Sequence, residues 1–325
     1  MDLDRMLELC RRNQWHVDDL DWSAAPRPMP REQEMAVVQY FTDMAGIELL
    51  AAALFEVQRD RSEEPVLRDI FETFVVDEIR HSRVAERLAH HYDRNHYKIY
   101  FRNAHMERFR RHFVDALEHV SPEIANAYIT TGELLLDIAL LRSLNDYVDD
   151  EMSHQAMEKI NRDESRHIAM DFFMIERYAS PEHVAAEAAK PPKPPLELLR
   201  GWWAVGSFMM AGRPFFRDVF FGPMELTDPS GARMREAFKR AQLIGERPDV
   251  AARPFSRFMQ RLQDAFMHPV IGPIARPLVT RIMGVDPSVI RPLYDDAEAR
   301  RAAHMSLEEQ AREALGERDP LVAQA

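Results

Sequence analysis

A five-residue pattern, Asp-Glu-x-Arg-His, occurs twice in the sequence, and its side chains are of the kinds that bind metal ions. The first copy, DEIRH, begins at Asp77, and the second, DESRH, begins at Asp163. In each copy the Glu and the His are three positions apart, so on a helix both side chains lie on one face and can reach the same ion. The metal-binding candidates in the two copies are Glu78, His81, Glu164 and His167.

Each copy is preceded by a segment that carries a Glu in the middle of an apolar helical face. These residues are Glu48 and Glu133, and most residues three, four and seven positions from them are apolar. Glu48 precedes Glu78 by 30 positions, and Glu133 precedes Glu164 by 31 positions. Because helical neighbours at these spacings share a face, both carboxylates should point into the core. The chain therefore contains one kind of helix pair, used twice.

Four carboxylates in one core require a compensating positive charge. Buried carboxylates lose their hydration and repel one another, at a cost of several kcal/mol per ion, unless cations neutralise them. Two divalent metals would supply four positive charges against the four carboxylates. The predicted ligands of this two-metal site are Glu48, Glu78, His81, Glu133, Glu164 and His167.

With these six residues in this order and spacing, residues 33–178 resemble a ferritin-like di-iron carboxylate protein. Such proteins place a Glu from each of two helices, and a Glu-x-x-His from each of the other two, around two metals. The fuller Asp-Glu-x-Arg-His pattern resembles that of oxygen-activating members, such as bacterial multicomponent monooxygenases and acyl-carrier-protein desaturases. The length and helical organisation also resemble the p-aminobenzoate N-oxygenase family.

The resemblance implies a fold, a cofactor and an activity. The implied fold is all-α, a ferritin-like four-helix bundle with additional C-terminal helices. The implied cofactor is two iron ions, Fe/Fe or alternatively Mn/Fe. The implied enzyme activates O2 to hydroxylate, N-oxygenate or desaturate a small or acyl-type organic substrate. Because the sequence contains no flavin- or nicotinamide-binding fingerprint, the electrons should come from an external donor, a ferredoxin or a flavin reductase.

The Asp and Arg of each pattern are predicted to support the ligands. A metal-bound His commonly donates its second ring N–H to a carboxylate. The resemblance implies that Asp77 and Asp163 each support the His of the opposite half, although Asp77 is also spaced to reach His81. Arg80 and Arg166 follow the Asp residues by three positions, which permits Asp–Arg pairing, with a solvated Arg as the alternative.

The second half of the site has the more polar surroundings. Asp137 lies one turn beyond Glu133, near where several resembling oxygenases and desaturases have a Thr that assists oxygen activation. We therefore predict Asp137 and Thr130 as catalytic residues, with Asp137 serving as an extra ligand, a proton relay or a buried hydrogen-bond partner. Further polar residues on this face are Asn126, Asn161 and Asp171.

Two positions depart from related patterns. The p-aminobenzoate N-oxygenases have an additional His ligand one turn before the second Glu-x-x-His, where this chain has Ile160. The ribonucleotide reductase small subunit has a radical-forming Tyr where this chain has Ala85. Other readings stay open: a ferroxidase or iron-storage protein, a Mn/Fe ligand-binding oxidase, or a metal-stabilised interaction protein without turnover.

The elements that must position these residues are helices. Hydrophobic periodicity and capping residues predict helices at about 33–59, 66–92, 121–147 and 151–178. The charged segment 96–119 is either a covering helix or a long connection. We divide the chain into an N-terminal arm (1–32), a di-metal bundle (33–178) and additional helices packing on it (179–325). The arm contains Trp15 and receives no predicted chemistry. The aromatic and Met-rich segments 201–210 and 213–221 are either core or the lining of a substrate tunnel.

Composition narrows the class of protein. The chain of 325 residues is 46% hydrophobic and 30% charged and contains 11 Gly, which is typical of a compact helical protein. Its net charge of −12 disfavours nucleic-acid binding. The single Cys excludes an intrachain disulfide, and the acidic start lacks the features of a signal peptide, so we expect a cytoplasmic protein. Charges and prolines interrupt residues 202–224, so we predict no membrane span. The sequence leaves open whether the chain forms a homodimer.

Overall fold

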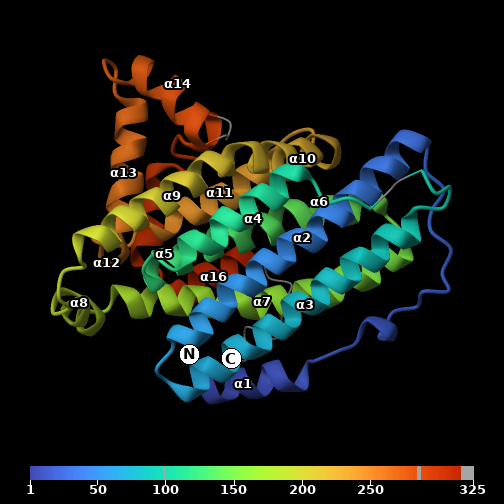
Figure 1. Cartoon of the computed structure of the whole chain (residues 1–325), viewed down its shortest axis with the longest axis horizontal. Coiled ribbons are helices and arrows are strands. Elements are labelled where there is room, and N and C mark those ends of the chain that lie inside the picture. Colours follow the sequence, from blue (N-terminus) through green and yellow to red (C-terminus); the bar gives the residue numbers. More distant parts are fainter. Residues whose placement is uncertain (98–99, 284–286, 316–325) are drawn as a thin grey trace.

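The computed structural model of the chain describes residues 1–97, 100–283 and 287–315. In these ranges all regular structure is helical, which confirms the predicted all-α class (Figure 1). Four long helical segments lie at its centre and contact one another in a closed ring. In ring order they are α2 (Arg31–Arg61), α3 (Pro65–Tyr92), α7 (Glu151–Ala179), and the continuous run of α5 (Pro122–Leu134), the π-helical segment η2 (Leu135–Leu141) and α6 (Arg142–Val148).

Local chemistry fixes where these helices begin and end. The Ser121 side chain accepts a hydrogen bond from the Ile124 N–H, and Pro122 occupies the first helical position of α5. At the far end, Asp149 adopts a left-handed conformation with φ of 49°, which stops α6. Asp150 then caps α7 by accepting from the Ser153 N–H. These two adjacent residues turn the chain so that α7 returns alongside α5.

The N-terminal arm contains a helix that the sequence did not lead us to expect. α1 (Leu3–Arg12) is capped by Asp2 and packs against α3 and α7, and the 3-10 turn η1 (Val17–Asp19) follows it. Its inward residues Met6, Leu7, Leu9 and Cys10 are buried. The arm is therefore part of the core.

The remaining helices cover one side of the ring. α4 (Ala104–Leu117) packs between α2 and α9 (Pro195–Phe215), and α11 (Ala232–Ile244) and α16 (Leu307–Leu315) pack on α5 and α7, respectively. α13 (Pro254–Met267) and α14 (Gly272–Met283) project from the body (Figure 1). The shorter elements are α8 (Pro181–Ala188), the π-helical η3 (Phe216–Phe221), α10 (Gly222–Thr227), α12 (Pro248–Ala251), η4 (Pro287–Val289) and α15 (Asp296–His304).

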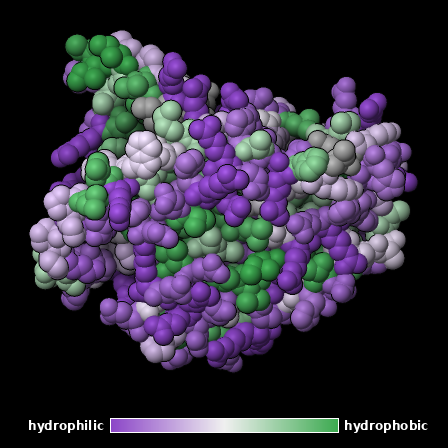
Figure 2. All heavy atoms as spheres, in the orientation of Figure 1, coloured by the Kyte–Doolittle hydropathy of each residue, from purple (hydrophilic) through white to green (hydrophobic). Residues whose placement is uncertain are grey.

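The segment 201–210 lies largely at the surface. Trp202 and Trp203 are 76% and 77% exposed, because α9 uses other faces to contact α4 and α14. The following segment is core in part: Phe215 is buried and stacks on Phe109 with ring centroids 4.0 Å apart. Apolar side chains also gather at the projecting end of the α13–α14 pair (Figure 2).

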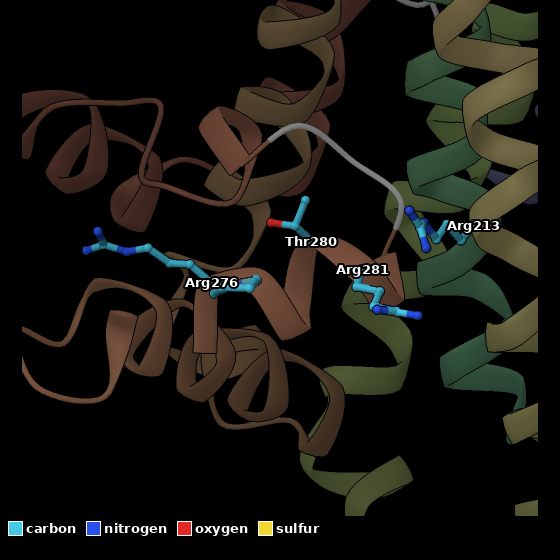
Figure 3. A pocket seen from close by; sticks show the side chains of 5 residues that line it. Arg213, Arg276, Thr280 and Arg281 are labelled. Atoms are coloured by element: carbon cyan, nitrogen blue, oxygen red, sulfur yellow. The ribbon is translucent and has the colours of Figure 1, made fainter. Parts of the chain in front are cut away.

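A surface pocket of about 610 Å³ lies between α9 and α14. Arg213 from α9 lines it, together with Arg276, Pro277, Thr280 and Arg281 from α14 (Figure 3). None of the six predicted metal ligands lines this pocket. It is therefore separate from the centre of the ring.

Within the described residues, two helical runs are long and apolar enough to cross a membrane by length and composition alone. They are α2 and the run Pro122–Val148, and 78% and 72% of their most apolar windows are buried inside the structure. Both runs belong to the central ring and carry Glu48 or Glu133. Their apolar character is accounted for by the core that they form.

Candidate metal centre

The six predicted ligands meet in the middle of the ring and form two overlapping groups. One group is Glu48, Glu78, His81 and Glu164, and the other is Glu78, Glu133, Glu164 and His167. Within each group, one potential ligand atom from every residue lies within 4.8 Å of the others. Glu78 and Glu164 belong to both groups. The arrangement can therefore hold two ions, with two carboxylates shared and one Glu and one His reserved for each.

The atoms at the centre of the cluster are buried and lack ordinary partners. Glu48, Glu78, His81, Glu164 and His167 are fully buried, and Glu133 is nearly so. Neither carboxylate oxygen of Glu48 makes a hydrogen bond to another described residue. Buried polar atoms without partners are rare in native proteins. Because carboxylate and imidazole donors converge here, the cluster fits divalent metal ions.

Each imidazole presents one nitrogen to the cluster and the other to an Asp. The Nδ1 atom of His81 lies 3.1 Å from Glu164 Oε1, and the Nδ1 atom of His167 lies 2.9 Å from Glu78 Oε1. With Nε2–H donating outward, Nδ1 keeps its lone pair for a metal. Phe55 and Phe74 pack against the His167 ring, with centroids 5.1 and 4.2 Å away, and exclude water from that side.

The supporting Asp residues pair with the His of the opposite half. His81 Nε2 lies 3.1 Å from Asp163 Oδ2, and His167 Nε2 lies 3.4 Å from Asp77 Oδ2. Arg80 bonds to both Asp residues, and Arg166 likewise donates to Asp163 at 2.6 Å and to Asp77 at 3.4 Å. Two Asp and two Arg give a network without net charge, so the four Glu residues carry the charge that metals must balance.

The N-terminal arm supplies two polar contacts that sequence reasoning missed. The indole N–H of Trp15 donates to Asp163 Oδ2 at 2.7 Å, and the Gln14 side-chain amide donates to Asp77 Oδ1 at 2.9 Å. These residues are 148 and 63 positions from their partners. No local spacing rule relates them to the repeated pattern, so only the packing of the arm could reveal them.

Asp137 and Thr130 are buried near Glu133 but engage other partners. The Asp137 carboxylate accepts a hydrogen bond from Arg142 at 2.7 Å, and the Thr130 hydroxyl donates to the Asn126 carbonyl at 2.8 Å. Asp137 lies in the π-helical segment η2, which begins two residues after Glu133. Such segments are frequent at functional sites. The catalytic assignment of both residues stays a prediction.

Three further positions shape the second half of the site. Asp171, one turn beyond His167, is buried, and neither of its carboxylate oxygens bonds to another described residue. Burial raises the pKa of Asp171 well above its usual range, which favours the protonated carboxyl group. Ile160 is fully buried and apolar. A Cβ built on the half-buried Gly132 would meet no atom within 4 Å, so a larger side chain would fit at that position.

The cluster without metal holds protons. Burial, and next the charge of Glu78, raise the pKa of Glu48 well above its ordinary value, and burial followed by Glu164 does the same for Glu133. Burial alone would lower the pKa of His81, but hydrogen bonds to Asp163, Glu164 and Glu78 raise it well above its ordinary value. Hydrogen bonds to Asp77 and Glu164 likewise raise the pKa of His167 well above its ordinary value, against the effect of burial. Metal binding must displace these protons.

Fe(II) affinity is therefore expected to rise with pH. A raised pKa means that the metal-free site keeps its protons to a higher pH than free side chains would, so lowering the pH favours the metal-free state. Affinity should change about tenfold per pH unit for each proton released. Anaerobic calorimetry in two buffers of different ionisation enthalpy counts the protons. An affinity independent of pH, with no proton released, would contradict the proton-filled cluster.

Comparisons with protein-family models, with curated proteins and with solved structures found no match to this chain.

Proposed function

We propose that this chain is a ferritin-like, di-iron oxidoreductase that uses O2 to hydroxylate, N-oxygenate or desaturate an organic substrate, with Mn/Fe as the alternative metal pair. The observation that carries the proposal is the pair of overlapping ligand groups that share Glu78 and Glu164. Shared carboxylates would hold two metals close together, at the spacing of roughly 3.5–4 Å typical of two-metal sites. Two adjacent redox metals can deliver two electrons to one O2 molecule.

The protein's own residues would position the ligands and keep the site dry. Asp163 and Asp77 orient the two imidazoles, and the rings of Phe55 and Phe74 exclude water beside His167. Burial raises the pKa of Asp171, one turn from His167, and so favours its protonated form. We propose this carboxyl group as a proton donor during O2 reduction, because it lies in the same buried region.

The electron balance requires an outside partner. In a hydroxylation, one oxygen atom of O2 enters the substrate and the other leaves as water. Two of the four electrons come from the substrate bond and two from the metals. Each turnover must therefore return two electrons to the metals, and we propose a ferredoxin or a flavin reductase as the source.

The test is anaerobic loading with Fe(II) followed by a pulse of O2. Binding should saturate at about two Fe(II) per chain, and O2 uptake should be about one per two Fe(II), measured with an oxygen electrode and by Mössbauer spectroscopy of the resulting Fe(III). Many irons per chain would point instead to iron storage. Fewer than one metal per chain, or iron that does not react with O2, would overturn the proposal.

A further inference from the structure

Two adjacent residues of the N-terminal arm each contact one half of the metal centre. Trp15 bonds to Asp163, which supports His81, and Gln14 bonds to Asp77, which supports His167. Trp15 is only 4% exposed. One dipeptide thus reaches both outer carboxylates of the site, although it belongs to none of the four helices that carry the ligands.

Trp15 completes the hydrogen bonding of Asp163. One carboxylate oxygen accepts from Trp15 at 2.7 Å, from Arg80 at 3.0 Å and from His81 at 3.1 Å, while the other accepts from Arg166 at 2.6 Å. Three donors on one oxygen and one on the other hold Asp163 in one orientation. Losing the indole N–H would remove one of these donors and loosen the orientation of Asp163 and of the imidazole that it supports.

The arm is fixed firmly enough to act in this way. Two cations lie over the Trp15 ring, with the Arg80 guanidinium 4.9 Å and the Lys159 ammonium 5.5 Å from its centroid. Gln14 is held at both ends, because its amide also donates to the Cys10 carbonyl at 3.0 Å and its oxygen accepts from Arg80 at 2.7 Å. These contacts hold the Trp15 and Gln14 side chains in place.

We propose that Trp15 and Gln14 are positioning residues of the metal centre, Trp15 for His81 through Asp163 and Gln14 for His167 through Asp77. The inference rests on the proposed two-metal site. Changing an outer hydrogen-bond partner of a metal ligand typically lowers metal affinity about 10- to 100-fold. Because Trp15 and Gln14 act one step further out, we expect about a tenfold loss for each.

The experiment uses the Co(II)-loaded full chain and proton NMR. Co(II) shifts the exchangeable Nε2–H signals of bound imidazoles far from all others, and Asp163→Asn and Asp77→Asn assign the two signals. Trp15→Phe, which keeps an apolar ring but lacks the N–H, should shift the His81 signal and leave that of His167 in place. Gln14→Met should shift the His167 signal. A purely structural role for the arm would move both signals together.

Trp22→Phe is the matched control. Trp22 lies in the same arm, but its indole N–H donates to the Val17 carbonyl at 2.7 Å, and its ring stacks on Arg87. This variant should keep wild-type signals and affinity. Unchanged signals in both Trp15→Phe and Gln14→Met would overturn the inference. If one variant does not fold, the other still tests the role of its own residue. A wild-type chain that binds no Co(II) would instead overturn the proposed function.

Discussion

Glu164→Gln is expected to abolish binding of both metals, although the new side chain keeps the size and shape of the old one. Glu164 belongs to both ligand groups, so its carboxylate would bridge the two ions. An amide carries no charge and offers one good ligand oxygen, so the bridge cannot form. The remaining three carboxylates then balance too little of the metals' charge. We expect affinity to fall on the order of 100-fold or more, beyond the usual effect of changing an outer partner.

Metal analysis after anaerobic loading and gel filtration measures this effect. Glu48→Gln is a useful comparison, because Glu48 belongs to only one of the two ligand groups. This variant should still bind the ion of the second group. Glu158→Gln on the exposed side of α7 is the matched control and should keep full occupancy. If Glu164→Gln retained two metals per chain, the shared role of this carboxylate would be wrong.

Glu48→Met is expected to stabilise the metal-free protein and to remove most of the stabilisation that metals provide. Glu48 is fully buried and its oxygens bond to no other described residue. Such a group costs roughly 1–3 kcal/mol or more of folding free energy. Met has a similar length and no polar oxygen, so the metal-free variant should gain about that much. Metals at a thousandfold excess over Kd should add about 4 kcal/mol to the free energy of unfolding of the wild type.

The pH dependence of the stability difference between Glu48→Met and the wild type tests the same explanation. Burial and Glu78 raise the pKa of Glu48 in the folded state above its value in the unfolded chain. The part of this cost that depends on ionisation is therefore absent below the unfolded pKa of about 4.3 and grows as the pH rises toward the folded pKa. The advantage of Glu48→Met should be larger near pH 7 than near pH 4.

Denaturant unfolding in the presence of a chelator, and again with Mn(II), measures both effects. Glu56→Met, on the exposed side of the same helix, is the control and should change neither. A metal-free Glu48→Met protein less stable than wild type at neutral pH would contradict the buried, uncompensated carboxylate.

The sequence by itself determined which residues meet. A Glu and a His three positions apart share a helix face wherever that helix is placed, and a Glu surrounded by apolar residues at helical spacing must face the core. These are local properties of the chain. They identified Glu48, Glu133 and the two Glu-x-x-His pairs, and they predicted the central helices to within a few residues.

The tertiary structure decided which atoms each residue faces. Helical periodicity gives the face of a helix but not its rotation or its shift along a neighbour. Those variables made Glu78 and Glu164 the shared carboxylates and paired each Asp with the opposite His. They also gave Asp137 its partner Arg142.

The arm shows this limit most clearly. Trp15 lies 148 positions from Asp163, and only the packing of α1 against α3 and α7 brings them together. Contacts across such distances depend on the sum of many side-chain contacts in the core, not on any spacing in the chain. The candidate metal ligands could therefore be predicted from the sequence, whereas the arm residues that bond to the supporting Asp side chains became visible only in the folded protein.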